Sequence, residues 1–213
     1  MKRIMLVLAL LAMGTILFAQ VNLPADYRFA SGSWAISGQR LYQNDARAGL
    51  AKMNIRVPQS GAMLYEFDAR YESGGEDGHG GFGLHIFVDS AFNGPSWGAG
   101  TSYLLWLNYD ENPGTRQIPR GLSAQVYRSY SNSRMDLVQS YDLNYIADMV
   151  TYDDLNYPVH FRITADGNTG EVRVYDPTVA SGTVYYELAL KDMPKTGNWV
   201  ALRTNGVRLS FTN

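Results

Sequence analysis

The sequence predicts an all-β protein in which two antiparallel sheets pack face to face as a sandwich. Residues Ala62 to Glu72 alternate between apolar and polar side chains, so this strand has one face for a core and one for solvent. Asp166-Gly-Asn-Thr-Gly170 is one of several turn-forming segments that separate short apolar or alternating runs. No long run of helical periodicity lies between these strands. Strands joined by tight turns, without long helices, are typical of an antiparallel sandwich.

The first half of the chain begins with a predicted hairpin over Ser33 to Gln43, which turns at Ser37-Gly38. Ala48 to Val57 is the next expected strand, and we expect it to stop at Pro58 and Gly61. After the Ala62 to Glu72 strand we expect a Gly-rich loop at Ser73 to Gly81, a strand at Phe82 to Asp89 and a long loop containing a Trp at Ala91 to Gly100. A strand at Ser102 to Tyr109 and a turn at Asp110 to Gly114 follow.

The second half alternates again over Leu122 to Ser129. Asp136 to Leu155 is the segment with the weakest pattern, compatible with a strand at Leu137-Val138 and a helical turn within Asn144 to Val150. The last expected elements are a hairpin over Val159 to Tyr175, a strand over Thr183 to Leu190, and a closing hairpin over Gly197 to Asn213. The closing hairpin is expected to turn at Thr204-Asn205-Gly206.

The N-terminus has the pattern of a secretory signal peptide. A basic start, Met1-Lys2-Arg3, precedes an apolar run from Ile4 to Phe18 and then Ala19-Gln20. The run is shorter than the roughly 20 residues that a spanning helix needs, although an uncleaved anchor is the alternative. We therefore expect residues 1–20 to be removed. Residues 21–213 are expected to form one exported domain, periplasmic or extracellular, with no remaining transmembrane segment.

Composition narrows the function classes. The chain has no cysteine, so neither disulfides nor thiolate metal sites are available. Its net charge is -2 and it has no basic run, whereas nucleic-acid binding needs clustered Lys and Arg that neutralise phosphates. We expect no nucleic-acid partner. The 15 tyrosines and 21 glycines suit strands joined by tight turns.

Three stretches resemble the concanavalin A-like lectin/glucanase superfamily: the entry from Trp34 to Gln43, the expected strand pair from Tyr65 to Val88, and the end from Val159 to Asn213. The superfamily includes laminin G-like modules, bacterial sugar-binding domains and family-16-like glycoside hydrolases. The resemblance implies a concanavalin A-like jelly-roll sandwich. That fold serves sugar binding, sugar hydrolysis and structural adhesion, so the resemblance alone does not choose among them.

The hydrolase alternative rests on Glu66 and Asp68. Family-16 glucanases carry Glu-x-Asp-x-Glu on one strand face, and Glu66 and Asp68 match the first two positions. Retaining cleavage needs two carboxyls about 5 to 5.5 Å apart. Arg70 stands in the third position and cannot donate a proton at neutral pH, while Glu72 could serve only if a bulge drew it back. We therefore assign no catalytic residues, keep Glu66 and Asp68 as weak candidates, and favour a solvated face bridged by ion pairs.

A ligand-binding face follows from phasing the strands against one another. The predicted core positions on three neighbouring strands are Leu84, Ile86, Val88, Leu105, Leu107, Tyr109, Leu122, Ala124 and Val126, with Phe87 on the opposite face. If these strands share a sheet with Ala62 to Glu72, the outer face gathers the predicted ligand-binding residues Arg70, His85, Trp106, Asn108, Gln125 and Tyr127. Trp106 and Tyr127 are expected to stack on a sugar. The alternative is that Trp106 and Phe87 are covered by the Ala91 to Gly100 loop.

We expect neither a metal site nor a cofactor. The Glu76-Asp77-Gly78-His79 loop supplies two carboxylates, whereas calcium takes six to eight oxygens. Calcium is thus the one ion left open. His79, His85 and His160 lack the spacing of zinc ligands.

The sequence favours a non-catalytic binding module with a glycan as its ligand. The first alternative is a structural protein of the cell envelope or of a periplasmic appendage, such as a filament sheath, with an envelope protein as partner, because Tyr is enriched at protein interfaces. The second is the glycoside hydrolase described above. The sequence does not predict an oligomeric state.

Overall fold

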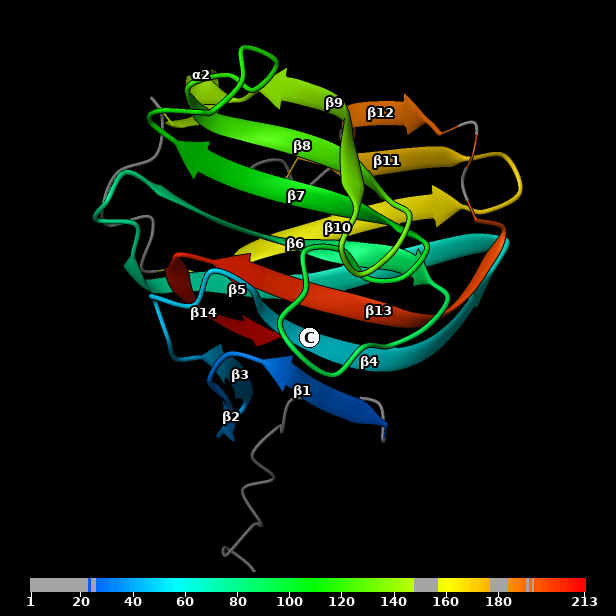
Figure 1. The fold of residues 1–213 in the computed structure, drawn as a ribbon, viewed down its shortest axis with the longest axis horizontal. Coiled ribbons are helices and arrows are strands. Elements are labelled where there is room, and N and C mark those ends of the chain that lie inside the picture. Colours follow the sequence, from blue (N-terminus) through cyan, green and yellow to red (C-terminus); the bar gives the residue numbers. More distant parts are fainter. Residues whose placement is uncertain (1–22, 24–25, 148–156, 177–183, 191, 193) are drawn as a thin grey trace, which may run out of the picture.

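The protein is a concanavalin A-like jelly-roll sandwich of two antiparallel seven-stranded sheets, as the computed structural model shows (Figure 1). The structure describes residues 23, 26–147, 157–176, 184–190, 192 and 194–213. The predicted signal peptide, residues 1–20, lies outside this part. Among the described residues, no helix is long and apolar enough to cross a membrane.

The first sheet has the order β1-β4-β13-β6-β7-β8-β9. Its strands are β1 (Tyr27–Ser31), β4 (Ala51–Ser60), β6 (His79–Val88), β7 (Ser102–Asp110), β8 (Gly121–Ser129), β9 (Met135–Asp142) and β13 (Thr196–Asn205). The second sheet has the order β12-β11-β10-β5-β14-β3-β2. Its strands are β2 (Trp34–Ser37), β3 (Arg40–Gln43), β5 (Ala62–Gly74), β10 (Val159–Asp166), β11 (Glu171–Tyr175), β12 (Val184–Ala189) and β14 (Val207–Thr212). A helical turn, α2 (Asn144–Ala147), follows β9.

Two predicted strand pairings are wrong because the chain changes sheet at those points. β5 and β6 lie in different sheets, and so do β13 and β14, so neither the strand pair from Tyr65 to Val88 nor the closing hairpin forms. The two corners pack together, with Gly75 N–H donating to Gly206 O at 2.9 Å. Gly206 has φ +68°, and a Cβ there would lie 2.9 Å from His79 O. Glycine therefore permits a corner too tight for a side chain.

The two predicted local hairpins are confirmed. β2 pairs with β3 and β10 pairs with β11, each antiparallel. The strand and helical turn expected after Asp136 are also present as β9 and α2, while residues 148–156 of that segment lie outside the described part. β1, by contrast, was not predicted; it pairs with β4 at the edge of the first sheet.

Pro58 does not end its strand as predicted, because β4 continues through it to Ser60. A proline has no N–H to donate to a ladder. β1 pairs with β4 only as far as Ile55, and the register of β4 against β13 shifts between Gly197 and Trp199, opposite Pro58. The proline thus occupies a position where neither neighbour requires its N–H.

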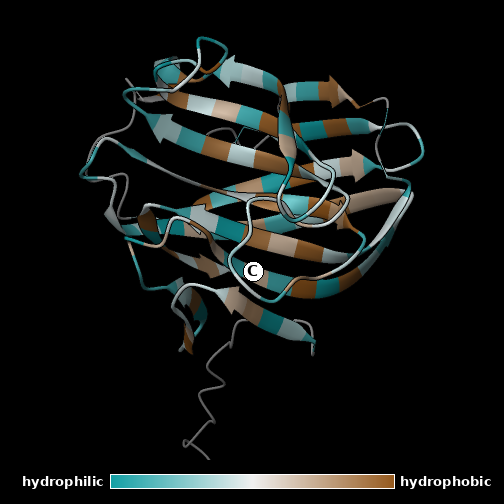
Figure 2. Ribbon diagram, viewed as in Figure 1, coloured by the Kyte–Doolittle hydropathy of each residue, from teal (hydrophilic) through white to brown (hydrophobic). Residues whose placement is uncertain are grey.

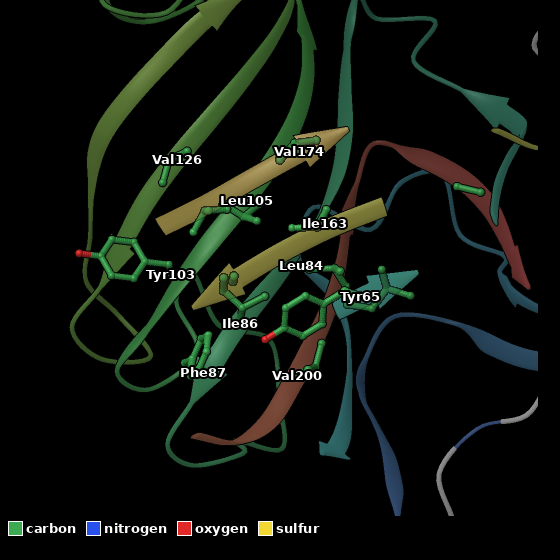
Figure 3. Packing of buried hydrophobic residues seen from close by; sticks show 14 of the residues in the cluster. Tyr65, Leu84, Ile86, Phe87, Tyr103, Leu105, Val126, Ile163, Val174 and Val200 are labelled. Atoms are coloured by element: carbon green, nitrogen blue, oxygen red, sulfur yellow. The ribbon is translucent and has the colours of Figure 1, made fainter. Parts of the chain in front are cut away.

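The core lies between the sheets. Hydrophobic and hydrophilic residues alternate along many strands (Figure 2). The predicted inward set of β5 joins the core, with Tyr65 and Ala69 buried. Figure 3 shows Ile163 and Val174 of the second sheet near Leu84, Leu105 and Val126 of the first. The remaining buried members of the cluster include Trp34, Leu41, Met53, Tyr103, Val172, Leu188, Val200, Leu202, Leu209 and Phe211.

The predicted phase of β6 is right up to Ile86 and wrong beyond it. Phe87, expected outside, lies in the main core beside Ile86 (Figure 3), and Val88 packs in a small second cluster with Ala201. Ile86 and Phe87 together oppose a single residue of β13, which defines a β-bulge. Phe87 has φ +54°, the one positive φ of a non-glycine among the described residues. Its N–H donates to Gln59 Oε1 at 2.8 Å, which holds the bulge in place.

Candidate functional site

The six predicted ligand-binding residues do not share one surface. Arg70 is on β5, in the second sheet, whereas His85, Trp106, Asn108, Gln125 and Tyr127 are on β6, β7 and β8 of the first. The prediction assumed that β5 and β6 belong to the same sheet, and the corner between them separates Arg70 from the rest. The other five come together, because β7 lies between β6 and β8 in antiparallel register.

Arg70 lies instead in a ladder of ion pairs on the outer face of the second sheet. Its Nε and Nη2 donate to Glu72 Oε1 at 2.9 and 2.8 Å. His160 Nδ1 lies 2.7 Å from Asp68 Oδ1, and Arg162 Nε lies 3.5 Å from Glu66 Oε1. Glu66 and Asp68 thus each face a basic side chain of β10. This arrangement is the solvated, ion-paired face that the alternating charges indicated.

Glu72, which a glucanase mechanism would need as its acid, is set for the opposite protonation state. Burial raises the pKa of its carboxyl, but hydrogen bonds from Ser210 and Arg70 and the charges of Arg70 and Arg40 outweigh burial and lower it. A general acid at neutral pH needs a raised pKa. This carboxylate therefore serves as a hydrogen-bond acceptor for its neighbours.

On the first sheet, the predicted polar side chains bond to one another. The Tyr127 hydroxyl donates to Gln125 Oε1 at 2.6 Å, and Gln125 Nε2 donates to Ser123 Oγ at 3.0 Å. Trp106 Nε1 donates to Asn108 Oδ1 at 2.9 Å. Gln125 and Trp106 are buried, while Asn108 and Tyr127 are half-buried. Among these hydrogen-bonded side chains, Asn108 and Tyr127 are therefore the ones that solvent reaches.

Trp106 is covered. Its indole lies against Gly81 of β6, where a Cβ would approach Trp106 Cζ2 to 2.8 Å. The guanidinium of Arg203 lies 5.2 Å from the Trp106 ring and 4.7 Å from the Trp97 ring, so the cation is stacked with both indoles. Trp97 remains 48% exposed. Of these two indoles, Trp97 is therefore the one available to a ligand, and it was not among the predicted residues.

Trp97 belongs to the connection between β6 and β7, residues 89–101, which crosses in front of β13 and β4 (Figure 1). Lys52 Nζ donates to Ser96 O, Ser96 Oγ and Gly98 O at 3.0, 2.5 and 2.6 Å. Arg203 Nη1 donates to Trp97 O at 2.7 Å. Side chains from two strands thus fix the loop that holds Trp97. We call this area, the outer face of β4, β13, β6, β7 and β8 with residues 89–101, the loop-covered face.

The loop-covered face has two buried basic side chains at its centre. Lys52 and Arg203 are almost wholly buried, and neither forms an ion pair with any carboxylate of the described chain. Burial and the Arg203 charge lower the pKa of Lys52 to about 7. Burial lowers the pKa of Arg203 to about 10, although the nearby Tyr127 raises it. Arg203 therefore stays charged at neutral pH, beneath Trp97.

His85 is neutral in this surrounding. Burial, Lys52 and Arg203 together lower its pKa well below the ordinary value. The Ser102 hydroxyl donates to Ala99 O at 2.8 Å, so it accepts from His85 Nδ1, 3.1 Å away, and this fixes the tautomer with the proton on Nδ1. His85 supports the loop from beneath and does not reach solvent.

Sequence reasoning missed Trp97, Lys52 and Arg203. Lys52 and Arg203 occupy outward positions of alternating strands, where a basic residue ordinarily meets water. Only the fold of residues 89–101 over the sheet buries them. The available signal was the long loop with a Trp beside a face rich in aromatic residues, which did raise the alternative of a covered patch.

The acidic loop before β6 gathers little. His79 is the first residue of β6, and its Nδ1 lies 3.1 Å from Asp77 Oδ2. In the part of the chain that the structure describes, no three His, Asp or Glu side chains converge as metal ligands would.

No known protein family matches the sequence, and no curated protein matches it. Solved structures match the fold. A carbohydrate-binding module of class CBM66 from Bacillus subtilis superposes with a TM-score of 0.55 at 16% identity, over 88% of this chain and 92% of that one. A functionally unknown protein from Saccharomyces cerevisiae superposes with a TM-score of 0.51 at 8% identity, over 88% of this chain and 92% of that one. The carbohydrate recognition domain of Emp47p gives 0.46 at 16% identity, over 92% of each chain. The first two likenesses, with TM-scores above 0.5, support the sandwich fold and nothing beyond it.

Proposed function

We propose that this protein is a non-catalytic binding module that recognises a glycan on its loop-covered face. The observation that carries the proposal is Trp97: a half-exposed indole on a loop fixed by Lys52, stacked on the buried guanidinium of Arg203. Sugars present C–H faces that pack on flat aromatic rings, and a ring already held in place loses little conformational entropy on binding. A large exposed aromatic with such support suits a ligand surface.

Polar contacts come from the half-buried side chains beside it. Tyr127 lies close enough to Arg203 for the guanidinium charge to oppose the increase that burial causes in the pKa of its hydroxyl. Asn108 accepts from Trp106 through Oδ1, which leaves its amide NH₂ as a donor for a ligand hydroxyl. In this account Trp106, His85 and Gln125 support the surface from beneath, and Arg70 takes no part.

Two further considerations support a glycan. The fold is one that carbohydrate-binding modules use, although a fold by itself does not determine a function. The signal-like residues 1–20 fit export to the periplasm or beyond, where glycans are available as ligands. We propose no cofactor, and calcium enters as a condition of the test.

The test is a glycan array with residues 21–213, with and without calcium, followed by titration of the selected glycan. Trp97→Ala should abolish binding in a protein that still folds, with only the modest loss of thermal stability expected when one ring is removed from Arg203. Trp97→Phe should retain part of the binding. Phe29→Ala removes a ring of similar exposure from β1 and serves as the control. An array without binding, together with a co-purifying envelope protein, would instead favour the structural alternative. Turnover of a β-glucan that Glu66→Gln abolishes would favour the hydrolase.

A further inference from the structure

A cavity lies at one end of the sandwich, and Trp97 is not among the residues that line it. It opens near β9 and β12, which lie side by side (Figure 1) and touch through the stacked rings of Tyr141 and Tyr186. Its volume is about 290 Å³, near the lower limit of ligand pockets. We call it the end pocket, and it is lined by Tyr103, Arg128, Tyr130, Val138, Ala189, Leu190 and Asp192.

Arg128 is the basic side chain among the residues that line the end pocket. It alternates with Ala124 and Val126 on the inward face of β8, so it points between the sheets and away from the loop-covered face. Its guanidinium lies 4.8 Å from the Tyr103 ring and 5.6 Å from the Tyr130 ring. Figure 3 shows the Tyr103 hydroxyl directed away from the core cluster, and Tyr103 is one of the residues that line the pocket.

Two nitrogens of Arg128, Nε and Nη1, are buried and have no hydrogen-bond acceptor in the described chain. Buried charged donors ordinarily have partners, because a buried donor without one is strongly destabilising. The cavity beside Arg128 has room for a molecule that supplies the missing acceptor oxygens.

Asp192 determines what kind of molecule fits. It lines the same cavity, yet no ion pair within 4.0 Å joins it to Arg128. The other nearby charges, Arg134 and Asp136, pair with each other at 3.2 Å. A carboxylate ligand would satisfy Arg128 but meet repulsion from Asp192. A molecule with hydroxyl groups satisfies both, since each hydroxyl can accept from the guanidinium or donate to the carboxylate.

We propose that the end pocket binds a single uncharged sugar residue, either a monosaccharide or the terminal residue of a glycan. Arg128 donates to its oxygens and Asp192 accepts from its hydroxyls. Leu190, Val138 and Ala189 contact its C–H face. This site is independent of Trp97, so either proposal can fail while the other stands.

The test is ligand-observed saturation-transfer NMR on the purified protein with neutral hexoses, ketohexoses and N-acetylhexosamines, and with hexuronates as the charged comparison. At least one neutral sugar should bind, and Arg128→Gln and Asp192→Asn should each weaken it about tenfold. Trp97→Ala should leave this binding unchanged. Asp192 is exposed, so its variant should fold normally, and thermal unfolding checks both variants.

Three outcomes would overturn the proposal. The first is that no neutral monosaccharide binds. The second is that a neutral sugar binds but neither Arg128→Gln nor Asp192→Asn weakens it. The third is that only hexuronates bind and Asp192→Asn strengthens their binding, which would make the pocket an anion site.

Discussion

Lys52→Met tests the buried amino group that donates hydrogen bonds to the loop that carries Trp97. Methionine keeps a long, flexible apolar side chain and removes the charge, so the three hydrogen bonds to Ser96 and Gly98 are lost while packing is largely retained. The variant also removes a titrating group. The result can therefore be measured as a change in the pH dependence of stability, and not only as a loss of stability.

The magnitude follows from the pKa of Lys52. The folded protein releases the Lys52 proton near pH 7, whereas the unfolded chain keeps it up to the ordinary value of 10.5. Between these values the unfolded state holds more protons, so the free energy of unfolding increases with pH. For this group alone, the increase from pH 7 to pH 9 is about 2 kcal/mol. The increase should be present in the wild type and absent in Lys52→Met.

Urea unfolding followed by Trp fluorescence at pH 7, 8 and 9 measures both proteins, and the difference between them isolates Lys52 from other titrating groups. If Lys52→Met shows the same increase as the wild type, the increase does not come from Lys52. If neither protein shows an increase, the three loop oxygens keep the ammonium group charged, and the account of its burial is wrong.

Other variants test the supports of the bulge and of the loop-covered face. Gln59→Leu leaves Phe87 N–H, Tyr65 O–H and Trp199 C=O without their hydrogen-bond partner. It should lower the free energy of unfolding by about 3 kcal/mol. Gln39→Leu, at an exposed position, is the control. Gly81→Ala places a Cβ 2.4 Å from Leu107 O and should cost about 2 kcal/mol or more, whereas Gly114→Ala, with open space around it, should cost little. Because the pKa of buried His85 is lowered, only the unfolded state binds the extra proton below pH 6.5. The free energy of unfolding should therefore decrease by up to about 1.4 kcal/mol for each unit by which the pH is lowered below 6.5. His85→Gln should reduce this pH dependence. Urea unfolding measures all of these variants. Equal losses of stability in a variant and its control, or an unchanged pH dependence in His85→Gln, would contradict these assignments.

Local patterns predicted the strands, because alternation and turn residues act over a few neighbouring positions. The β5 alternation and the β10–β11 hairpin are confirmed for that reason. Whether consecutive strands pair or change sheet was not predictable in the same way. The turns at Gly75 and Gly206 have the composition of hairpin turns, and only the packing of one corner on the other shows that they join different sheets.

The candidate site was predictable in part. Alternation correctly placed His85, Trp106, Asn108, Gln125 and Tyr127 on one outer face. It could not show that residues 89–101 fold back over this face, since that depends on hydrogen bonds between residues about 45 or more positions apart, such as those of Lys52 and Arg203. This long-range contact explains why Trp97 is exposed where the prediction had Trp106.

The most direct test of the glycan site is to follow the four Trp indole N–H signals by NMR while the array-selected glycan is added. The account predicts that the Trp97 signal shifts with the titration, and that Trp34, buried at the second sheet, does not move. A titration in which binding occurs while the Trp97 signal stays fixed would contradict the account and place the glycan elsewhere on the protein.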